Sequence, residues 1–415
     1  MVDPSTSAKW FTATRLRTHG LILALCLWSV YVWNMTTPGL IDRAGNLKGT
    51  DFLYFYTVGS LALTHRGSDL YNMTEQSKLA AERVPAAAGI HYLPLYPPQV
   101  SIFFAPFARL PYPCALILWL FVSSLIYGGC CHSLWRACPN LRNHKLTVVI
   151  LALAFPAFWN LIAWGQTSAL ALACFTVAFF ALRAQRGLPA GLALGCLIFK
   201  PQLALAAALV FVVTLNWKVI AGALLSATME LAAAWLYYGS APIRDWMHTL
   251  LNLPSLLPQL EPRLYQTHSL RTFWSMLVPW PSVALGLYVI TALLVSGLII
   301  ACWRSRLSSS LSLSMRYSAL LLATVLLAPH LTVYDLVILA PAFLLLSDWI
   351  VTQPDQPATR QFKLLLYLAF VLPLVGPLAL WTHVQLSVPV MAALLYGILN
   401  LGRKSGLVPN SLDVT

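Results

Sequence analysis

The chain has 415 residues, of which 59% are hydrophobic and 9% are charged, and its mean hydropathy is +0.73. A water-soluble protein of this length could not bury so much apolar surface, so we expect lipid to be its main solvent. The net charge of +13 does not indicate nucleic-acid binding, because the basic residues are scattered between apolar runs and form no continuous stripe. The composition therefore predicts one integral membrane domain over residues 1–415.

Apolar runs recur along the whole chain and predict an all-α polytopic membrane protein with about twelve spans, several shorter than the roughly 20 residues of a straight crossing. The first run follows Lys9, Arg15 and Arg17 without a clear cleavage site, so we expect an uncleaved span and no signal peptide. The predicted spans are 20–35, 114–135, 146–163, 167–183, 188–199, 203–216, 219–238, 283–303, 317–328, 334–348, 364–381 and 387–402.

The positions of Lys and Arg predict the orientation of these spans. Most of them lie in the two tails or in short connections that share one side of the membrane, which the positive-inside rule assigns to the cytoplasm. Both termini are then cytoplasmic. The two long loops, 36–113 and 239–282, become extracytoplasmic, and the first loop contains the apolar, aromatic stretches 52–63 and 100–110, which we expect to form interfacial helices.

Asp51 is the most informative residue of the first long loop, because only 13 residues of the chain are Asp or Glu. It follows Gly49 and Thr50 and precedes an aromatic stretch. An acid at this point can cap the next helix, since its oxygen accepts from free backbone N–H groups. It can also act as a general base, with a pKa raised by apolar surroundings, and the two roles are compatible.

Four further residues at predicted outer turns are candidates for binding a sugar or phosphate. Lys200 precedes Pro201 at a span end, where it either contacts a phosphate or snorkels to the interface. For Gln166, helix capping is favoured over a hydrogen bond to a sugar hydroxyl. His330 follows a proline and can bind a phosphate oxygen, although a lone His is more often structural. Arg271 has the geometry for phosphate, but a solvated loop charge is an equal alternative.

Two other acids have simpler or no explanations at this point. For Asp335 we favour holding Tyr334 or capping the following helix. Glu230 lies inside a predicted span, where an acid normally marks a site or a charge pair, and no partner is evident.

Several chemistries lack the motifs that they need. The chain has no Walker loop, no dinucleotide fingerprint, no HExxH helix and no cysteine spacing typical of zinc or of a disulfide framework. We expect no cofactor and no metal. No predicted inner loop is long enough for a nucleotide-sugar-binding domain, so a sugar donor would arrive attached to a lipid.

Short motifs along residues 20–350 resemble glycosyltransferase family 87, the polyprenol-phosphate-mannose-dependent mannosyltransferases with the GT-C fold. The residues that carry the resemblance are Thr50-Asp51-Phe52 with Tyr54 to Tyr56, Asp69-Leu70-Tyr71, Tyr96-Pro97-Pro98 with Pro106, Gly165-Gln166, Lys200-Pro201-Gln202 and Tyr334-Asp335. The family's catalytic acid falls on Asp51, and a looser carry-over assigns the donor phosphate to Lys200 and His330. The paired acids of many other GT-C enzymes are missing, since neither Asp42 nor Asp69 is adjacent to Asp51.

This resemblance implies an inverting transfer of a hexose, usually mannose, from a polyprenyl-phosphate sugar to a lipid or glycan acceptor on the extracytoplasmic face. The expected location is the bacterial plasma membrane. Two alternatives remain at this stage: a transporter or flippase of a lipid-linked sugar, and a non-catalytic assembly protein of envelope synthesis. The acceptor, the sugar and the oligomeric state do not follow from the sequence.

Overall fold

The computed structural model describes residues 12–253, 255–256, 263–304 and 311–405. Within these ranges the chain is helical and has no strand; isolated bridges join Ile41 to Leu47 and Thr267 to Thr332. The helices of the first half are α2 (Ala13–Met35), α3 (Thr50–Leu63), η1 (Gly67–Asp69), α4 (Met73–Arg83), η2 (Pro85–Ala87), α5 (Gln99–Ala108), α6 (Tyr112–Arg136), η3 (Pro139–His144), α7 (Lys145–Leu153), α8 (Pro156–Trp164), α9 (Ser168–Arg183), α10 (Gly187–Gly195), η4 (Cys196–Phe199) and η5 (Pro201–Leu203).

The helices of the second half alternate long and short elements in the same way. They are α11 (Leu205–Val213), α12 (Trp217–Tyr238), α13 (Ala241–Leu251), η6 (Leu264–Gln266), α15 (Leu270–Leu277), α16 (Pro281–Arg304), α18 (Leu313–Leu327), η7 (Val333–Leu339), α19 (Ala340–Ile350), α20 (Pro357–Val371), η8 (Leu372–Leu378), α21 (Ala379–Thr382) and α22 (Ser387–Ser405).

Six of the described helical segments are long and apolar enough to cross a membrane. They are α2, α6, α12, α16, η7 with α19, and α20 through α21; a seventh is possible if η3–α7 and α8, which meet at 45°, form one broken span. The other predicted spans contain shorter helices, among them α9, α18 and α22. The expectation of a polytopic, all-helical protein is therefore confirmed in its coarse form, and the count of about twelve spans is not.

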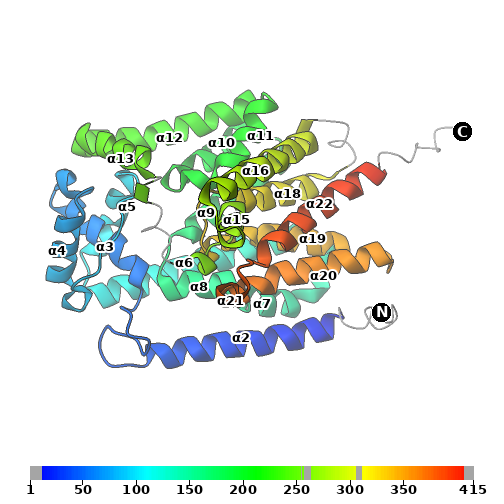
Figure 1. Cartoon of the computed structure of the whole chain (residues 1–415), viewed down its shortest axis with the longest axis horizontal. Helices are drawn as coiled ribbons and strands as arrows, with labels where there is room; N and C mark the ends of the chain where they lie inside the picture. Colours follow the sequence, from blue (N-terminus) through cyan, green and yellow to red (C-terminus); the bar gives the residue numbers. More distant parts are fainter. Residues whose placement is uncertain (1–11, 254, 257–262, 305–310, 406–415) are drawn as a thin grey trace, which may run out of the picture.

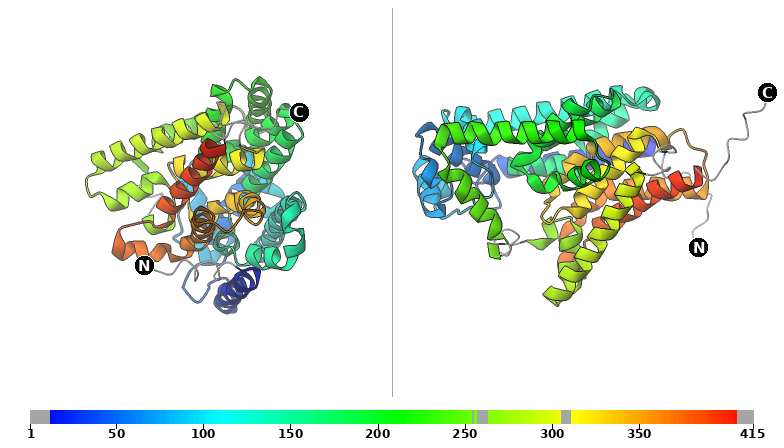
Figure 2. Two further views of the ribbon diagram at one scale, coloured as in Figure 1. Left: turned by 90° about the vertical axis from the view of Figure 1, so that its right-hand side faces the viewer. Right: turned by 90° about the horizontal axis from the view of Figure 1, so that it is seen from above.

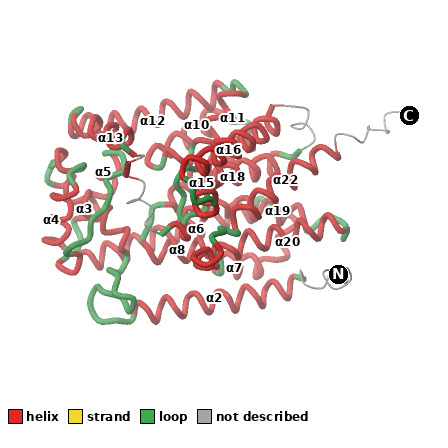
Figure 3. Tube along the Cα trace, viewed as in Figure 1, coloured by secondary structure: helices red, strands yellow, loops and turns green. Residues whose placement is uncertain are grey.

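The long helices run in roughly the same direction, with α2 and α12 along opposite edges of the bundle (Figure 1). Helices α3, α4, α5 and α13 gather at one end, whereas α2 begins and α22 finishes at the other, and the view from above agrees (Figure 2). Much of the loop that follows α2 lies at the first of these ends (Figure 3). Helix α13 thus shares one end of the bundle with α3, α4 and α5, although it is far from them in the sequence.

Helix α3 is enclosed on all sides, unlike the interfacial helix that the sequence led us to expect. Every side chain from Phe52 to Ala62 is buried, and α5 packs along it. The ring of Phe52 stacks on Trp119 of α6, and the ring of Phe104, which meets both of them edge to face, stacks on Phe55. Large apolar residues occupy every side of α3. A helix in the membrane interface buries only one face in lipid, so the remaining faces of α3 need to pack against protein. We call the unit formed by α3, α4 and α5 the cap.

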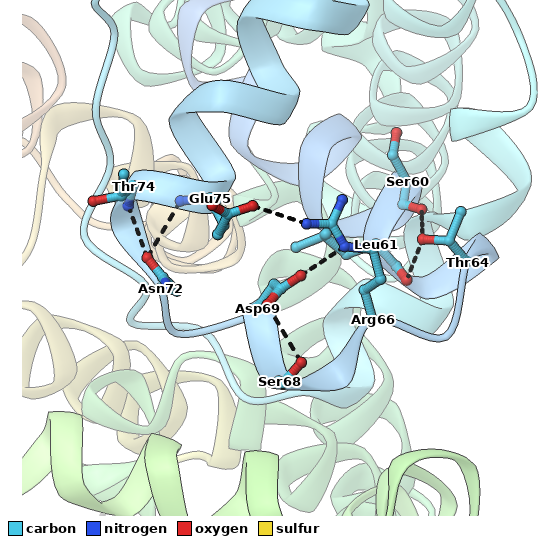
Figure 4. Close-up of polar contacts among 9 residues, drawn as sticks. All are labelled: Ser60, Leu61, Thr64, Arg66, Ser68, Asp69, Asn72, Thr74 and Glu75. Atoms are coloured by element: carbon cyan, nitrogen blue, oxygen red, sulfur yellow. Dashed lines mark hydrogen bonds and ion pairs between the residues drawn. The ribbon is translucent and has the colours of Figure 1, made fainter.

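A group of ion pairs fixes the turn between α3 and α4 (Figure 4). The Arg66 guanidinium donates to Asp69 at 2.6 Å and to Glu75 at 3.0 Å. The Asn72 side chain accepts from the backbone N–H groups of Thr74 and Glu75, which caps α4. Asp69 is thereby occupied in holding the turn.

Close contact between α3 and α5 requires a glycine at position 59. A Cβ at Gly59 would lie 2.6 Å from the Phe104 carbonyl oxygen, which is backbone and moves only with its helix. We predict that Gly59→Ala destabilises the protein by about 1–3 kcal/mol through overpacking. Thermal unfolding in detergent measures the effect.

Gly128→Ala is the matched control, because Gly128 lies in α6 with open space around its Cα. There the added methyl should be neutral or stabilising by up to about 1 kcal/mol, since Ala favours the helix. Equal shifts for the two variants would contradict the close packing of α3 against α5.

Candidate active site

A cavity of about 820 Å³ opens between the cap and the helical bundle. Its wall is formed by the last turn of α2, the loop before α3, the start of α3, residues 91–96, the last turn of α8, residues 199–202, part of α13, residues 263–267 and residues 329–335. The polar lining includes four of the five residues selected from the sequence, namely Asp51, Gln166, Lys200 and His330. Residues separated by almost 280 positions therefore meet in one place.

The loop before α3 determines where Asp51 lies. Gly49 precedes the helix with φ of +67°, a conformation that favours glycine, and a Cβ there would also collide with Leu116. The Tyr112 hydroxyl donates to the backbone oxygens of Lys48 and Gly49 at 2.8 and 3.0 Å, and the Tyr92 hydroxyl donates to that of Thr50. Asp51 is consequently held in the first turn of α3, half-buried, at the cavity wall.

Gln166 binds Asp51 directly. Its Nε2 donates to Asp51 Oδ2 at 2.6 Å and lies 3.3 Å from the Tyr334 hydroxyl, and its Oε1 accepts from the Thr167 backbone N–H and the Tyr96 hydroxyl. The capping role that we favoured for Gln166 from the sequence is wrong, since α9 has no side-chain cap. Asp51 does not cap α3 either, because the residue before the helix is Gly49 and no side chain caps it.

Gly165 brings Gln166 to this position. It follows α8 with φ of +71°, and a Cβ would lie 2.8 Å from that of Phe52, the neighbour of Asp51. Trp119 Nε1 donates to its carbonyl oxygen at 3.0 Å. The end of α8 can approach α3 this closely only because the residue has no side chain.

Burial raises the pKa of Asp51 to about 6. The hydrogen bond from Gln166 and the positive charge of Lys200 oppose this shift, whereas the negative charge of Asp335 adds to it. The carboxyl group thus changes protonation close to neutral pH, which suits a group that accepts a proton during a reaction.

Lys200 is buried and paired, so it does not snorkel to an interface. Its Nζ lies 2.7 Å from Asp335 Oδ1 and donates to Ser168 Oγ at 3.0 Å, and the two charged side chains are 4% and 2% exposed. The same ammonium group lies 5.1 Å from the centre of the Tyr334 ring. The sequence reasoning missed this pair, although a lysine at membrane depth calls for an acidic partner.

Asp335 has a second role, as we had expected. Its Oδ2 accepts from the Thr332 backbone N–H at 3.2 Å, and the Thr332 side chain in turn accepts from the backbone of Asp335, which forms a capping box at the start of η7. The acid therefore fixes both η7 and Lys200.

The structure separates the two remaining candidates. His330 lines the cavity, whereas Arg271 is absent from the lining, and its Nη1 donates to the Pro329 carbonyl oxygen at 3.1 Å. Arg263 lines the cavity instead. Sequence reasoning passed over Arg263 because nothing in its local pattern distinguishes it from other loop charges.

Glu230 acquires a partner from the cap. Its Oε2 accepts from Gln99 Nε2 of α5 at 3.3 Å, and Ser101 and Tyr238 form a second bond between the same helices at 2.7 Å. These bonds tie the cap to α12. Among the described residues, no group of three or more His, Cys, Asp and Glu side chains is arranged to hold a metal ion.

The helices and the cavity define a membrane protein with a half-buried acid, Asp51, in the wall of a cavity beside the bundle. The sequence model of glycosyltransferase family 87 matches residues 95–329, which is more than half of the chain, so the chain belongs to this family and is a membrane glycosyltransferase. The matched region contains Gln166 and Lys200, but it begins after Asp51 and ends one residue before His330. Comparison with curated proteins and with solved structures finds no match.

We predict that Lys200→Met destabilises the protein by about 3–5 kcal/mol, because it leaves the Asp335 carboxylate buried without its cation. Lys200→Met combined with Asp335→Asn should recover part of this loss, since a neutral amide requires no counter-charge and its oxygen can still accept from Thr332. Chemical denaturation in micelles, followed by tryptophan fluorescence, compares the two. A double variant no more stable than the single one would contradict a charge-based role for the pair.

Proposed function

We propose that the protein transfers a hexose, most simply mannose, from a polyprenyl-phosphate sugar to a hydroxyl of a lipid or glycan acceptor, with inversion at the anomeric carbon. The observation that supports this proposal is the Asp51 carboxylate, which lines a cavity of about 820 Å³, is held by Gln166, and has a pKa of about 6. Membership of glycosyltransferase family 87 supports the reaction class.

The proposed reaction is a single displacement. Asp51 takes the proton of the acceptor hydroxyl while the oxygen attacks the anomeric carbon from the side opposite the phosphate. The bond between that carbon and the phosphate oxygen breaks, and its electron pair leaves with the polyprenyl phosphate. Gln166 is a positioning residue in this scheme, because both ends of its amide are engaged by protein groups. No cofactor and no metal take part in the proposed step.

The leaving phosphate needs positive charge in addition to Lys200. The charge of Lys200 is already balanced by Asp335 at 2.7 Å, so the ammonium alone adds little net attraction. We assign the remaining attraction to His330 and Arg263, both of which line the cavity. Arg271, the arginine selected from the sequence, acts indirectly in this proposal by holding the carbonyl of Pro329, next to His330.

The proposed location is the bacterial plasma membrane, with the cavity extracytoplasmic and both termini cytoplasmic. Two observations support this orientation: the cap lies at the end of the bundle opposite the start of α2 and the finish of α22 (Figure 1), and basic residues are concentrated in short connections. An even number of crossings, about twelve, requires the shorter apolar helices to cross as tilted or broken spans.

We predict that Asp51→Asn lowers the rate of transfer about 100- to 10,000-fold, because the amide cannot accept the proton. The assay offers purified protein radiolabelled polyprenyl-phosphate-mannose and a bacterial membrane-lipid extract, and it measures labelled lipid. Asp69→Asn serves as control, since Asp69 is bound to Arg66 away from the cavity. A rate of transfer by Asp51→Asn equal to that of wild-type protein would contradict the assignment of Asp51 as the general base. Carrier binding without any product from wild-type protein would favour a transporter.

The pH dependence of transfer tests the same assignment. The base must be deprotonated, so kcat/KM should be half-maximal near pH 6, the pKa of Asp51, and should fall as pH decreases below that value. Gln166→Leu should move this midpoint to higher pH, because the lost hydrogen bond had stabilised the carboxylate. Gln202→Leu, which alters another lining residue, should leave it unchanged. A profile flat between pH 5 and 8 would contradict titration of Asp51.

We predict that Arg263→Ala raises the KM for the donor about tenfold or more, the effect of losing one charge-assisted hydrogen bond. Arg271→Ala, which removes an equal charge outside the lining, should raise it less. Initial rates at varied donor concentration measure both. The reverse ranking would return the phosphate contact to Arg271.

A further inference from the structure

A second cavity, of about 600 Å³, lies where α9 and α11 end, α12 and α18 begin, and α16 ends. In Figure 1 this is the end of the bundle where α2 begins, opposite the cap. The cavity is therefore separate from the one that contains Asp51. Its lining consists of Leu182, Gln185, Phe211, Thr214, Leu215, Asn216, Trp217, Lys218, Trp303, Leu313 and Arg316.

Among the residues that the structure describes, the lining holds two cations, Lys218 and Arg316, and no acid. Both lie in the first turn of a helix, α12 and α18 respectively, and neither first turn contains an acidic residue. A cation at a helix N-terminus is unfavourable, because the backbone N–H groups already produce a partial positive charge there. A bound anion would offset both effects at once.

Trp303 provides a second, independent indication. The Arg316 guanidinium lies 5.2 Å from the centre of the Trp303 ring, and the indole Nε1 is buried with no hydrogen-bond partner in the described part of the chain. An indole nitrogen can only donate, so the atom that satisfies it must be an acceptor, such as a phosphate oxygen. A donor and two cations beside one cavity favour an anionic ligand.

The backbone at the cavity is also unusual. Gln185 and Leu215 have φ of +59° and +53°, two of the four described non-glycine residues with positive φ. Each follows the end of a helix, α9 or α11, and lines the cavity. A branched residue such as Leu rarely adopts this conformation, and strain of this kind concentrates at binding sites.

We propose that this cavity binds the phosphate of an anionic phospholipid, with Lys218, Arg316 and the Trp303 indole contacting the headgroup. The apolar lining residues Leu182, Phe211 and Leu313 provide the surface for an acyl chain. Basic pockets between membrane helices at the cytoplasmic side bind lipid headgroups by this chemistry, and the distribution of Lys and Arg assigns this end to the cytoplasm. The proposal is independent of the reaction proposed above.

Native mass spectrometry of the full-length protein in neutral detergent tests the proposal. The probes are phosphatidylglycerol, phosphatidylcholine with the same acyl chains, and inorganic phosphate. We expect wild-type protein to bind phosphatidylglycerol at least about tenfold more tightly than phosphatidylcholine, and Lys218→Gln combined with Arg316→Gln to remove this preference. Arg142→Gln combined with Lys145→Gln is the matched control, because both residues are exposed basic groups outside the lining.

Trp303→Phe keeps an aromatic ring beside Arg316 and removes the N–H donor together with the smaller ring of the indole. It should weaken phosphatidylglycerol binding about three- to tenfold without lowering the midpoint of thermal unfolding, which keeps the test valid if the double glutamine variant does not fold. Equal binding of the two lipids by wild-type protein would overturn the proposal. So would equal losses in the cavity and control variants, or inorganic phosphate competing at the same concentration as the lipid.

Discussion

The arrangement of the site depends on one buried ion pair, Lys200 with Asp335. These residues come from segments 135 positions apart, and their bond at 2.7 Å joins the break between η4 and η5 to the start of η7. Ser168, at the N-terminus of α9, donates to Asp335 at 2.5 Å and brings a third segment to the same point. The Lys200 ammonium also lies over the Tyr334 ring, whose hydroxyl lies beside Gln166, the residue that binds Asp51. A series of side chains in direct contact therefore connects the Lys200–Asp335 pair to Asp51 and determines where Asp51 lies.

Three segments that carry site residues, those around Gln166, Lys200 and His330, are interruptions between helices, and the bilayer explains why they cluster. Backbone groups that leave a helix inside a membrane must find partners in protein or in a water-filled cavity, since lipid offers none. The chain bends at Gly165, at Pro201 and at Pro329, and all three interruptions reach one cavity, whose lining includes polar side chains. There the freed groups are used: the Gly165 oxygen accepts from Trp119 and the Thr332 N–H donates to Asp335. Interruption of the helices and formation of the site are consequences of the same constraint.

The helices and the candidate acid Asp51 could be predicted from the sequence, because both follow from composition and from the order of neighbouring residues. Apolar runs correspond to helices, and Asp51 stands out in a chain with 13 acidic residues. It could not predict the Lys200–Asp335 pair or the Gln166–Asp51 bond, which connect residues 135 and 115 positions apart. Burial of α3 was missed for a different reason: a stretch apolar on every face suits lipid and protein equally, and only the packing of α5 and α6 decides between them. Arg263 could be identified as a site residue only from the structure, because its place in the cavity lining is what distinguishes it from other loop charges.

The same contacts that position Asp51 also set its proton affinity. Lys200 lowers the pKa of Asp51 and Asp335 raises it, so the two members of the pair largely oppose each other at this site. The pKa of about 6 then reflects mainly burial, which raises it, against the Gln166 hydrogen bond, which lowers it. An unpaired lysine would stabilise the carboxylate further and make it a weaker base. An unpaired Asp335 would raise the pKa of Asp51, and the Asp51 carboxyl group would be more protonated at neutral pH. Pairing Lys200 with Asp335 therefore leaves Asp51 with a pKa near neutral pH, which is the condition under which the general-base step proposed above is most effective.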